Sequence, residues 1–302
     1  MAKVVVVGSV ALDDVQTPFG EVKNALGGSA VYASIACSLF SSAGIVGVVG
    51  GDFPKEHIEL LKEKKVDLAG LEMRNGGKTF HWKGKYGLDL NNPKTLDTQL
   101  NVFETFSPRL PKEYCDADYL FLGNISPKLQ LSVLAQMKKR PGLVVADTMN
   151  LWINLQHEEV LEVVKQVDIA LMNDSEARLL FKTSSIVVAA REILKLDSKI
   201  AIIKKGEHGC VMFTDSKHFS CPGYPLENVK DPTGSGDSFG GSLIGYLAKT
   251  NDFSEENLRR AIVYASCVAS FNAEGFSVEK LRQISIKDVQ ARYKEFEGFV
   301  KF

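Results

Sequence analysis

The chain has 302 residues, of which 45% are hydrophobic and 24% are charged, and its formal net charge is −1. This length can bury one large core, and the near-neutral charge gives no basic field that would attract nucleic acid or an acidic membrane. The five cysteines are scattered without metal-ligand spacing, and no apolar run approaches the roughly 20 residues that span a bilayer. We therefore expect a cytoplasmic protein with reduced thiols, without a membrane or nucleic-acid partner.

The first predicted strand is the apolar run Val4–Val7, and Asp13 follows it closely. Ligands gather at the carboxyl ends of strands in parallel α/β sheets, so Asp13 is a candidate ligand-binding residue. A turn aspartate is the alternative. Gly27 and Gly28 then precede a helix of small residues, where the backbone can approach a ligand closely. Residues 46–50 predict a further strand that ends in a turn.

Residues 72–108 lack a long helical pattern, and the stretch 78–86 alternates as a strand does. We expect this segment to form an antiparallel flap with the stretch near 15–25. His81 and Trp82 either face a ligand there or pack against the other face of the flap. Trp152, the second tryptophan, is expected in the other half of the molecule.

From residue 118 onward, predicted strands and helices alternate. The strands are expected at 119–124, 143–147, 169–173 and 200–204, and the helices near 127–140, near 156–165 and from about 174. This rhythm predicts an α/β fold with a mostly parallel central sheet covered by helices on both faces. Asn124, Asp147 and Asn173 end three of these strands, and we expect them at one edge of the sheet.

The stretch 231–241 reads Asp-Pro-Thr-Gly-Ser-Gly-Asp-Ser-Phe-Gly-Gly and leads into an apolar series at helical spacing. At this helix N-terminus the amides of Gly234, Ser235 and Gly236 can approach an anion without interfering side chains. Asp237 is an acid where a phosphate would sit, so it suits proton transfer from an attacking hydroxyl better than phosphate binding. A glycine-rich turn with an acid favoured by the helix dipole is the alternative.

The Asp-x-Thr-Gly-x-Gly-Asp motif resembles the C-terminal signature of the ribokinase, or PfkB, family of carbohydrate and nucleoside kinases. The stretch 26–36 resembles the N-terminal signature of that family. The resemblance implies a single ribokinase-like domain over residues 1–302, with a small β-sheet lid formed by about 14–26 and 72–108. It also implies a kinase that uses ATP and Mg²⁺, with Asp237 as catalytic base and the amides of Gly234, Ser235 and Gly236 as the anion hole.

The resemblance implies further roles in binding. Acceptor-binding candidates are Asp13, Gly27, Gly28, Tyr32, Trp82 and Asn124, and nucleotide-binding candidates are Asn173, Lys204, Gly206, Gly209, Asn272 and Gly275. Glu176 would hold Mg²⁺ through water, and Asp231 would bind a monovalent cation such as K⁺. Asn173 with Glu176 also fits a helix cap. Lys204 stands where threonine is frequent in the family, so it either contacts phosphates or sits in solvent.

The nature of the acceptor is inferred from aromatic residues. Phe19, Tyr32, Phe80 and Trp82 offer rings on the expected acceptor side, and flat bases stack on such rings. We therefore expect the hydroxymethyl group of a nucleoside as acceptor, with a hexose or ribose as the alternative. From another functional class, the alternative is a catalytically silent nucleotide-binding regulatory protein, against which the intact Asp237 argues. The chain is expected to be a monomer or a homodimer formed through the lid.

Overall fold

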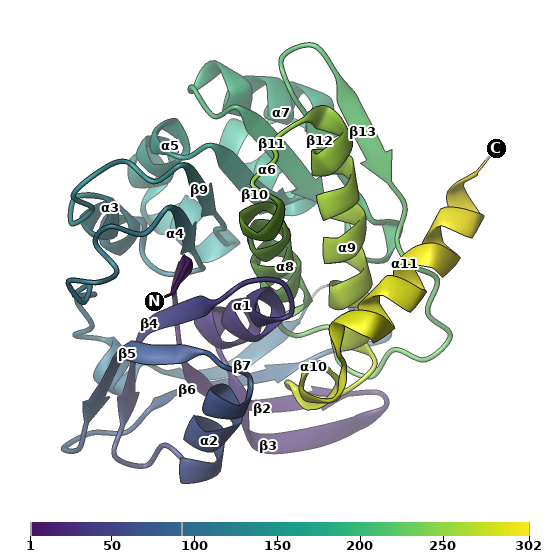
Figure 1. The fold of residues 1–302 in the computed structure, drawn as a ribbon. Coiled ribbons are helices and arrows are strands. Elements are labelled where there is room, and N and C mark those ends of the chain that lie inside the picture. The colour runs from purple at the N-terminus through teal and green to yellow at the C-terminus, as the bar shows by residue number, and fades with distance from the viewer. Residues whose placement is uncertain (1, 92, 302) are drawn as a thin grey trace.

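The computed structural model describes residues 2–91 and 93–301, so residue 92 of the expected lid and the end residues 1 and 302 lie outside the described residues. A large sheet forms the centre of the molecule (Figure 1), with the strands β1 (Val4–Val7), β4 (Ala43–Gly50), β5 (Asp67–Arg74), β8 (Tyr119–Leu122), β9 (Leu143–Ala146), β10 (Ile169–Asn173), β11 (Ile200–Lys204), β12 (Cys210–Phe213) and β13 (His218–Cys221). Their order is β13-β12-β11-β10-β9-β8-β1-β4-β5. All neighbours are parallel except where β12 pairs with β11 and β13, which confirms the expected mostly parallel sheet.

Two hydrophobic cores lie on the two faces of this sheet, because successive side chains of a strand point to opposite faces. Val4 and Val6 of β1 join the first core, and Val5 and Val7 join the second. The first core is covered by α1 (Ser29–Ser38), α2 (Lys55–Glu63), α8 (Ser235–Thr250), α9 (Glu255–Ala273), α10 (Glu279–Gln283) and α11 (Ile286–Val300). The second is covered by α3 (Pro127–Leu134), α4 (Asn150–Leu155), α5 (His157–Gln166), α6 (Asp174–Phe181) and α7 (Ile186–Lys195). The expectation of helices on both faces is confirmed.

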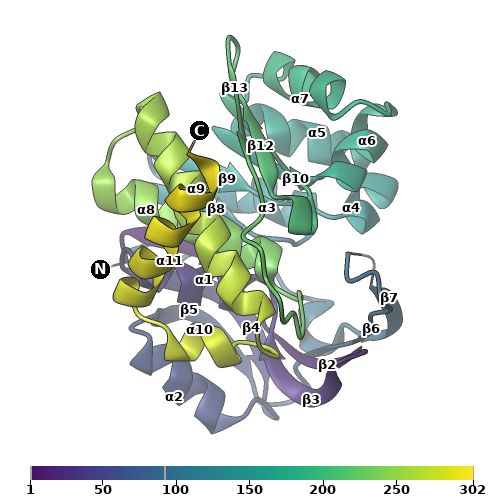
Figure 2. The same cartoon turned by 90° about the vertical axis from the view of Figure 1, so that its right-hand side faces the viewer.

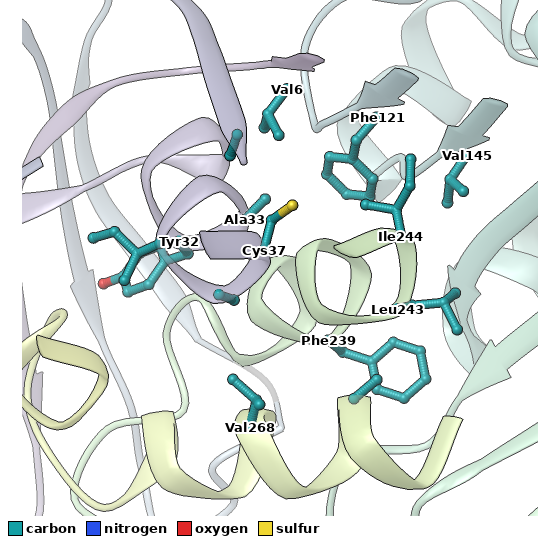
Figure 3. Close-up of a cluster of buried hydrophobic side chains, with 14 of the residues drawn as sticks. Val6, Tyr32, Ala33, Cys37, Phe121, Val145, Phe239, Leu243, Ile244 and Val268 are labelled. Carbon is teal, nitrogen blue, oxygen red and sulfur yellow. The ribbon is translucent and has the colours of Figure 1, made fainter. Parts of the chain in front are cut away.

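Helices α1 and α8 pack closely in the first core. Figure 3 shows Ala33 and Cys37 of α1 beside α8, and Ile244 of α8 pointing toward Phe121 on β8. A Cβ atom added at Gly241 of α8 would lie 2.0 Å from the carbonyl oxygen of Ala33, so only glycine permits this approach. The close packing brings the loop before α8 against the N-terminal half of α1.

A second, smaller sheet has the order β3-β2-β6-β7, with β2 (Ala11–Thr17), β3 (Gly20–Gly27), β6 (Phe80–Lys85) and β7 (Lys94–Gln99). In Figures 1 and 2 it lies at the end of the molecule opposite α7. Pairs β2–β3 and β6–β7 are antiparallel, but β2 and β6 are parallel, so the expected antiparallel flap is wrong at its central pair. The reason is that β2 follows β1 and β6 follows β5, and both leave the same edge of a parallel sheet.

The small sheet also has different bounds from the expected lid segments. Residues 72–74 complete β5 of the large sheet, and Val102 and Phe106 belong to the second core, with a short 3₁₀ helix, η1 (Asn101–Phe103), between the sheets. The strands of the small sheet therefore cover residues 11–27 and 80–99 rather than about 14–26 and 72–108. The small sheet ends at residue 99 because the apolar residues that follow, Val102 and Phe106, pack into the second core.

Several helices differ from the sequence-based expectation. Helix α3 ends at Leu134 rather than near residue 140, and α4 precedes the expected α5. The helix expected from 174 is two helices, because Lys182 adopts a left-handed conformation with φ 48° and Ser185 caps α7. None of the helices in residues 2–91 and 93–301 is both long and apolar enough to cross a membrane. The cytoplasmic location stays a prediction.

Candidate active site

The loop before α8 is held by contacts with two other helices. Gly234, at the N-cap of α8, has φ 77° and ψ 0°, a left-handed conformation that glycine adopts readily. A Cβ atom added there would lie 2.4 Å from the ring of Tyr32 on α1. On the other side, Nδ2 of Asn272 on α9 donates a hydrogen bond to the carbonyl of Thr233 at 2.7 Å. These contacts fix the loop conformation.

The expected anion hole is only partly free in this structure. The Ser235 N–H donates to the carbonyl oxygen of Pro232 at 3.0 Å. Gly236 lies in the first turn of α8, where an amide has no intrahelical acceptor and the helix dipole is positive. Gly234 and Gly236 are therefore the better amide donors for an anion, while Ser235 closes the turn.

Asp237 lies in the first turn of α8 and is partly buried. Its burial, together with the nearby carboxylate of Asp147, raises its pKa to about 7, although Lys204 acts in the opposite direction. A carboxylate with a pKa near neutrality can take up a proton and release it again at physiological pH. This property suits a general base.

Lys204, at the end of β11, is paired with a carboxylate rather than solvated. Its Nζ lies 2.6 Å from Oδ2 of Asp147, and the two side chains are 16% and 6% exposed, so the alternative of a solvent lysine is wrong. Burial alone would lower the pKa of Lys204, but Asp147, Glu176 and Asp237 raise it above its usual value, so the ammonium stays charged. A Cβ atom added at Gly236 would lie 3.2 Å from this Nζ, which places the ammonium beside the N-terminus of α8.

Asn173 and Glu176 form a capping box at the start of α6, which confirms the predicted helix cap. The Glu176 N–H donates to Oδ1 of Asn173 at 2.8 Å, and the Asn173 N–H donates to Oε2 of Glu176 at 2.7 Å. The second oxygen, Oε1, accepts from Nδ2 of Asn173 at 2.6 Å. Burial and then the charge of Asp147 raise the pKa of Glu176 to about 8, with Lys204 opposing.

The residues around Lys204 fit Mg²⁺ that is held mainly through water. Within the described part of the chain, no group of three or more His, Cys, Asp or Glu side chains is arranged to hold a metal ion directly. Both carboxylate oxygens of Glu176 already accept hydrogen bonds. The three carboxyl groups of Asp147, Glu176 and Asp237 lie near the single cation Lys204, so a divalent cation bound here would favour their ionised forms. Mg²⁺ usually keeps several waters, in agreement with this donor set.

Asp13 of β2 is buried on the other side of the loop. Burial raises its pKa well above the usual range, and so do the carboxylates of Asp231 and Asp237, which shows that these acids lie close enough to interact. A Cβ atom added at Gly27 would lie 1.9 Å from Oδ2 of Asp13, so glycine leaves room for this carboxylate. Gly28, with φ 98°, leads from β3 into α1.

Trp82 of β6 lies directly opposite Asp13 of β2 in the pairing register, so both side chains are on the same face of the small sheet. Its Nε1 donates to Oγ1 of Thr95 on β7 at 3.3 Å. His81 is on the other face, where its Nε2 lies 3.3 Å from Oδ1 of Asp14. Trp82 is thus on the face of the small sheet that carries Asp13, and His81 is on the other face, while a contact of Trp82 with the acceptor stays a prediction.

The other expected aromatic residues are placed differently. The ring of Tyr32 is 2% exposed and lies against Gly234, so it supports the loop and offers no open face to a base. Phe80 stacks on Phe103 with ring centroids 5.2 Å apart, and Phe19 is 58% exposed before the start of β3. Hydrophobic packing therefore takes up two of the four rings that the sequence suggested for the acceptor.

Comparison with known proteins identifies the family. The model of the pfkB family carbohydrate kinases matches residues 1–280. The chain belongs to this family. It is 30% identical over 253 residues to the cytidine kinase of Thermococcus kodakarensis, which covers 82% of this chain and 89% of that protein. Fructokinase-2 of Zea mays is 32% identical over 114 residues, which cover 36% of this chain and 33% of that protein.

A solved structure supports the ribokinase-like fold. An E. coli protein described as a candidate ribokinase II, with bound ATP and Mg²⁺, aligns with a TM-score of 0.81 and 18% identity, covering 98% of this chain and 100% of the other. At this identity the likeness concerns the fold. Membership of the pfkB family makes the chain a kinase that acts on a nucleoside or a sugar.

In this pfkB-family chain, Asp231, the predicted ligand of a monovalent cation, directly precedes the loop before α8 and is fully buried. Its Oδ1 accepts the Thr233 N–H at 2.9 Å, and burial raises its pKa. Oδ1 of Asn272 is buried and accepts no hydrogen bond from the described residues. A Cβ atom added at Gly275 would lie 2.9 Å from Cγ of Lys280, so close packing with α10 accounts for this glycine.

The predicted nucleotide-side turn consists of the 3₁₀ helix η2 (Gly206–His208) and its C-cap Gly209. Both glycines have positive φ, 57° for Gly206 and 78° for Gly209. A Cβ atom added at Gly206 would lie 2.0 Å from Oδ1 of Asn91, in the connection between β6 and β7. A Cβ atom added at Gly209 would lie 2.1 Å from the carbonyl oxygen of Cys221. Gly206 thus lies against the connection between β6 and β7, whereas Gly209 packs against β13.

Two residues of this site were missed by the sequence analysis. Trp152 of α4 was expected away from the acceptor side, yet its Nε1 donates to Oδ1 of Asn124 at 2.8 Å, and Asn124 is itself an acceptor candidate. Tyr86 was given no role, but its hydroxyl lies 3.0 Å from Oγ1 of Thr233 in the loop before α8. No local pattern reveals such contacts, which join residues 28 and 147 positions apart.

Proposed function

We propose that this kinase transfers the γ-phosphoryl group of ATP to a hydroxymethyl group of a nucleoside, with Asp237 as catalytic base. The observation that carries the proposal is the position of Asp237 at the N-terminus of α8, between the buried pair of Asp147 with Lys204 and the buried Asp13. A base, amide donors for an anion and a hydroxyl-binding carboxylate thus occur at one place. Phosphoryl transfer needs these groups.

Each group has a defined task in the proposed reaction. Asp13 accepts hydrogen bonds from acceptor hydroxyls and thereby directs the hydroxymethyl group toward Asp237, which takes its proton as the oxygen attacks phosphorus. The amides of Gly234 and Gly236 stabilise negative charge on the transferring group. Mg²⁺, when bound to the phosphates and through water to Glu176, supplies further charge neutralisation. The small sheet excludes water that would otherwise hydrolyse ATP.

A nucleoside is favoured as acceptor over a free sugar. The cytidine kinase is 30% identical over most of both chains, whereas probable fructokinases of Arabidopsis thaliana that match over a similar length are 23–27% identical. In addition, Trp82 provides a flat ring on the same face of the small sheet as Asp13. A hexose or ribose is the second candidate, because sugars also pack on aromatic faces and a fructokinase is among the relatives.

We also propose a monovalent cation such as K⁺ beside the loop. The support is a fully buried carboxylate, Asp231, and a buried amide oxygen without a partner in the described residues, Oδ1 of Asn272. The two segments are joined, because the Asp231 N–H donates to the carbonyl of Ala273 at 3.3 Å. A cation there would fix the conformation of the anion hole.

The proposed function is tested by measuring acceptor-dependent release of ADP from MgATP. The screen compares cytidine and other nucleosides with ribose and fructose, each with K⁺ or with Na⁺. We expect a nucleoside to give the highest kcat/KM. A sugar as the best acceptor would favour the second candidate, and no stimulation by any compound would favour the catalytically silent regulatory protein.

A further inference from the structure

The ammonium group of Lys204 lies between the negative carboxylate of Asp147 and the N-terminus of α8, where the helix dipole is positive. On one side, Nζ is 2.6 Å from Oδ2 of Asp147. On the other side, it lies next to Gly236, where an added Cβ atom would be 3.2 Å away. The amide of Gly236 is among those proposed to bind the transferring phosphoryl group. Lys204 is therefore near enough to a bound terminal phosphate to contact it by a change of side-chain rotamer.

The charges around Lys204 indicate a role beyond stabilising the fold. A buried ion pair contributes little net stability, because both charges lose their hydration. When ionised, the carboxyl groups of Asp147, Glu176 and Asp237 would also repel the phosphates of a nucleotide. Lys204 is the cation that lies near all three, and each of them raises its pKa. A lysine ammonium is a compact charge on a flexible stem, which suits it for binding phosphate.

We propose that Lys204 exchanges partners, leaving Asp147 and contacting the terminal phosphates when ATP binds. This inference rests on the proposed function and deepens it, because it assigns a phosphate-contacting cation to the end of β11. Asp147 acts as the holding partner, which keeps the ammonium charged and in place in the nucleotide-free protein. In the alternative, Lys204 only neutralises the buried acids, and its effect does not depend on the number of phosphates in the ligand.

The test measures nucleotide affinity without acceptor, so it does not depend on turnover. AMP, ADP and ATP are titrated by calorimetry into the wild type, Lys204→Met and the matched control Lys199→Met. Lys199 precedes the other end of β11, where its Nζ lies 2.8 Å from Oδ1 of Asp168. Methionine is an unbranched apolar side chain of nearly the length of lysine, without the charge. We expect Lys204→Met to lose roughly 10- to 100-fold in ATP affinity with AMP affinity unchanged, and Lys199→Met to resemble the wild type.

Retained AMP binding also shows that the Lys204→Met protein is folded. Equal losses for AMP and ATP, or no loss for either, would overturn the inference, because a purely structural lysine does not distinguish phosphate number. If the wild type itself bound no adenine nucleotide, the proposed function would fail, and the inference with it. The two failures are therefore distinguishable.

A second variant tests the exchange of partners. Asp147→Asn releases Lys204 and removes a carboxylate, so ATP should bind at least as tightly as in the wild type when titrated without Mg²⁺. The omission of the metal separates this effect from any contribution of Asp147 to Mg²⁺ binding. Adding Lys204→Met to Asp147→Asn should then abolish the gain. If Asp147→Asn alone weakens metal-free ATP binding as much as Lys204→Met does, the pair acts as a fixed unit and the exchange is wrong.

Discussion

At the scale of single residues, Asp237 and Asp13 are both acids with raised pKa, but their surroundings differ. The pKa of Asp237 is raised to about 7 while Lys204 opposes the rise, whereas for Asp13 all the causes raise the pKa, with burial first and Asp231 next. Environments of different charge allow two carboxyl groups to perform different tasks at one pH. Asp237 is thus suited to proton transfer, and Asp13 to holding hydroxyl groups.

Replacement of Asp237 by asparagine tests its role as base. The variant Asp237→Asn is nearly isosteric but cannot accept the proton, so kcat with the best acceptor should fall by about 10² to 10⁴. ADP affinity should persist, because the amides of the loop are unchanged. The measurement is steady-state kinetics together with calorimetry of ADP binding. A variant with near-normal kcat would remove Asp237 from the proposed role.

Replacement of Asp13 tests the binding of the acceptor. We expect Asp13→Ala to reduce kcat/KM for the acceptor by the equivalent of about 1–3 kcal/mol, because the acceptor hydroxyls lose their hydrogen bonds to a buried carboxyl group. ATP affinity without acceptor should not change, since Asp13 is proposed to bind only the acceptor. An equal loss of ATP affinity would indicate damage to the fold. Asp14→Ala is the matched control, because Asp14 contacts His81 on the other face of the small sheet.

At the scale of elements, the connection from β6 to β7 makes contacts with both halves of the proposed site. Tyr86 contacts Thr233 in the loop before α8, and Asn91 lies against Gly206 in the predicted nucleotide-side turn. The connection from β6 to β7 therefore reaches across from the side of Asp13 to that of Lys204. This arrangement supports the hypothesis that the sheet is a lid which closes over both substrates.

Fluorescence of Trp82 tests the movement of this lid. The emission of Trp82 is obtained as the difference between the wild type and Trp82→Phe, because replacing Trp152 instead would break its bond to Asn124. We expect a working acceptor to shift this difference spectrum saturably, and ATP alone to shift it far less. An unchanged Trp82 signal at saturation with acceptor would mean that the small sheet is static, for instance as part of a subunit interface.

At the scale of the whole molecule, the buried acids affect stability. The folded-state pKa of Asp237, about 7, lies above the usual 3.8, so the protonated form favours folding. This contribution is fully present below pH 4 and is lost as the pH rises through 7. The nucleotide-free protein should therefore lose stability between pH 5.5 and 8 through this group.

The variant Asp237→Asn tests this pH dependence, because asparagine does not titrate. In urea unfolding at pH 8, we expect the variant to be more stable than the wild type by roughly 1–2 kcal/mol, a value reduced by the partial exposure of Asp237. At pH 5.5 the difference should shrink. A difference that is the same at both pH values would show that Asp237 does not titrate in this range. Whether the molecule is a monomer or a homodimer stays a prediction for sedimentation experiments.

The sequence by itself determined the repeated strand–helix order and the position of the glycine-rich loop before α8. Strands β10 and β11 have the predicted bounds, 169–173 and 200–204, because buried parallel strands are continuous apolar runs ended by polar residues. Helix α8 begins at Ser235, directly after the predicted start near Gly234. These features depend on residues that are neighbours in the chain, so local pattern is enough to predict them.

Only the tertiary structure decided which distant residues meet. The burial of Lys204 depends on Asp147, 57 residues away, and the orientation of Asn124 depends on Trp152, 28 residues away. The parallel pairing of β2 with β6 and the packing of Tyr32 against Gly234 likewise follow from the path of the chain between sheets. Side-chain partners across such separations are set by how helices and strands pack, and local sequence periodicity carries no information about that packing.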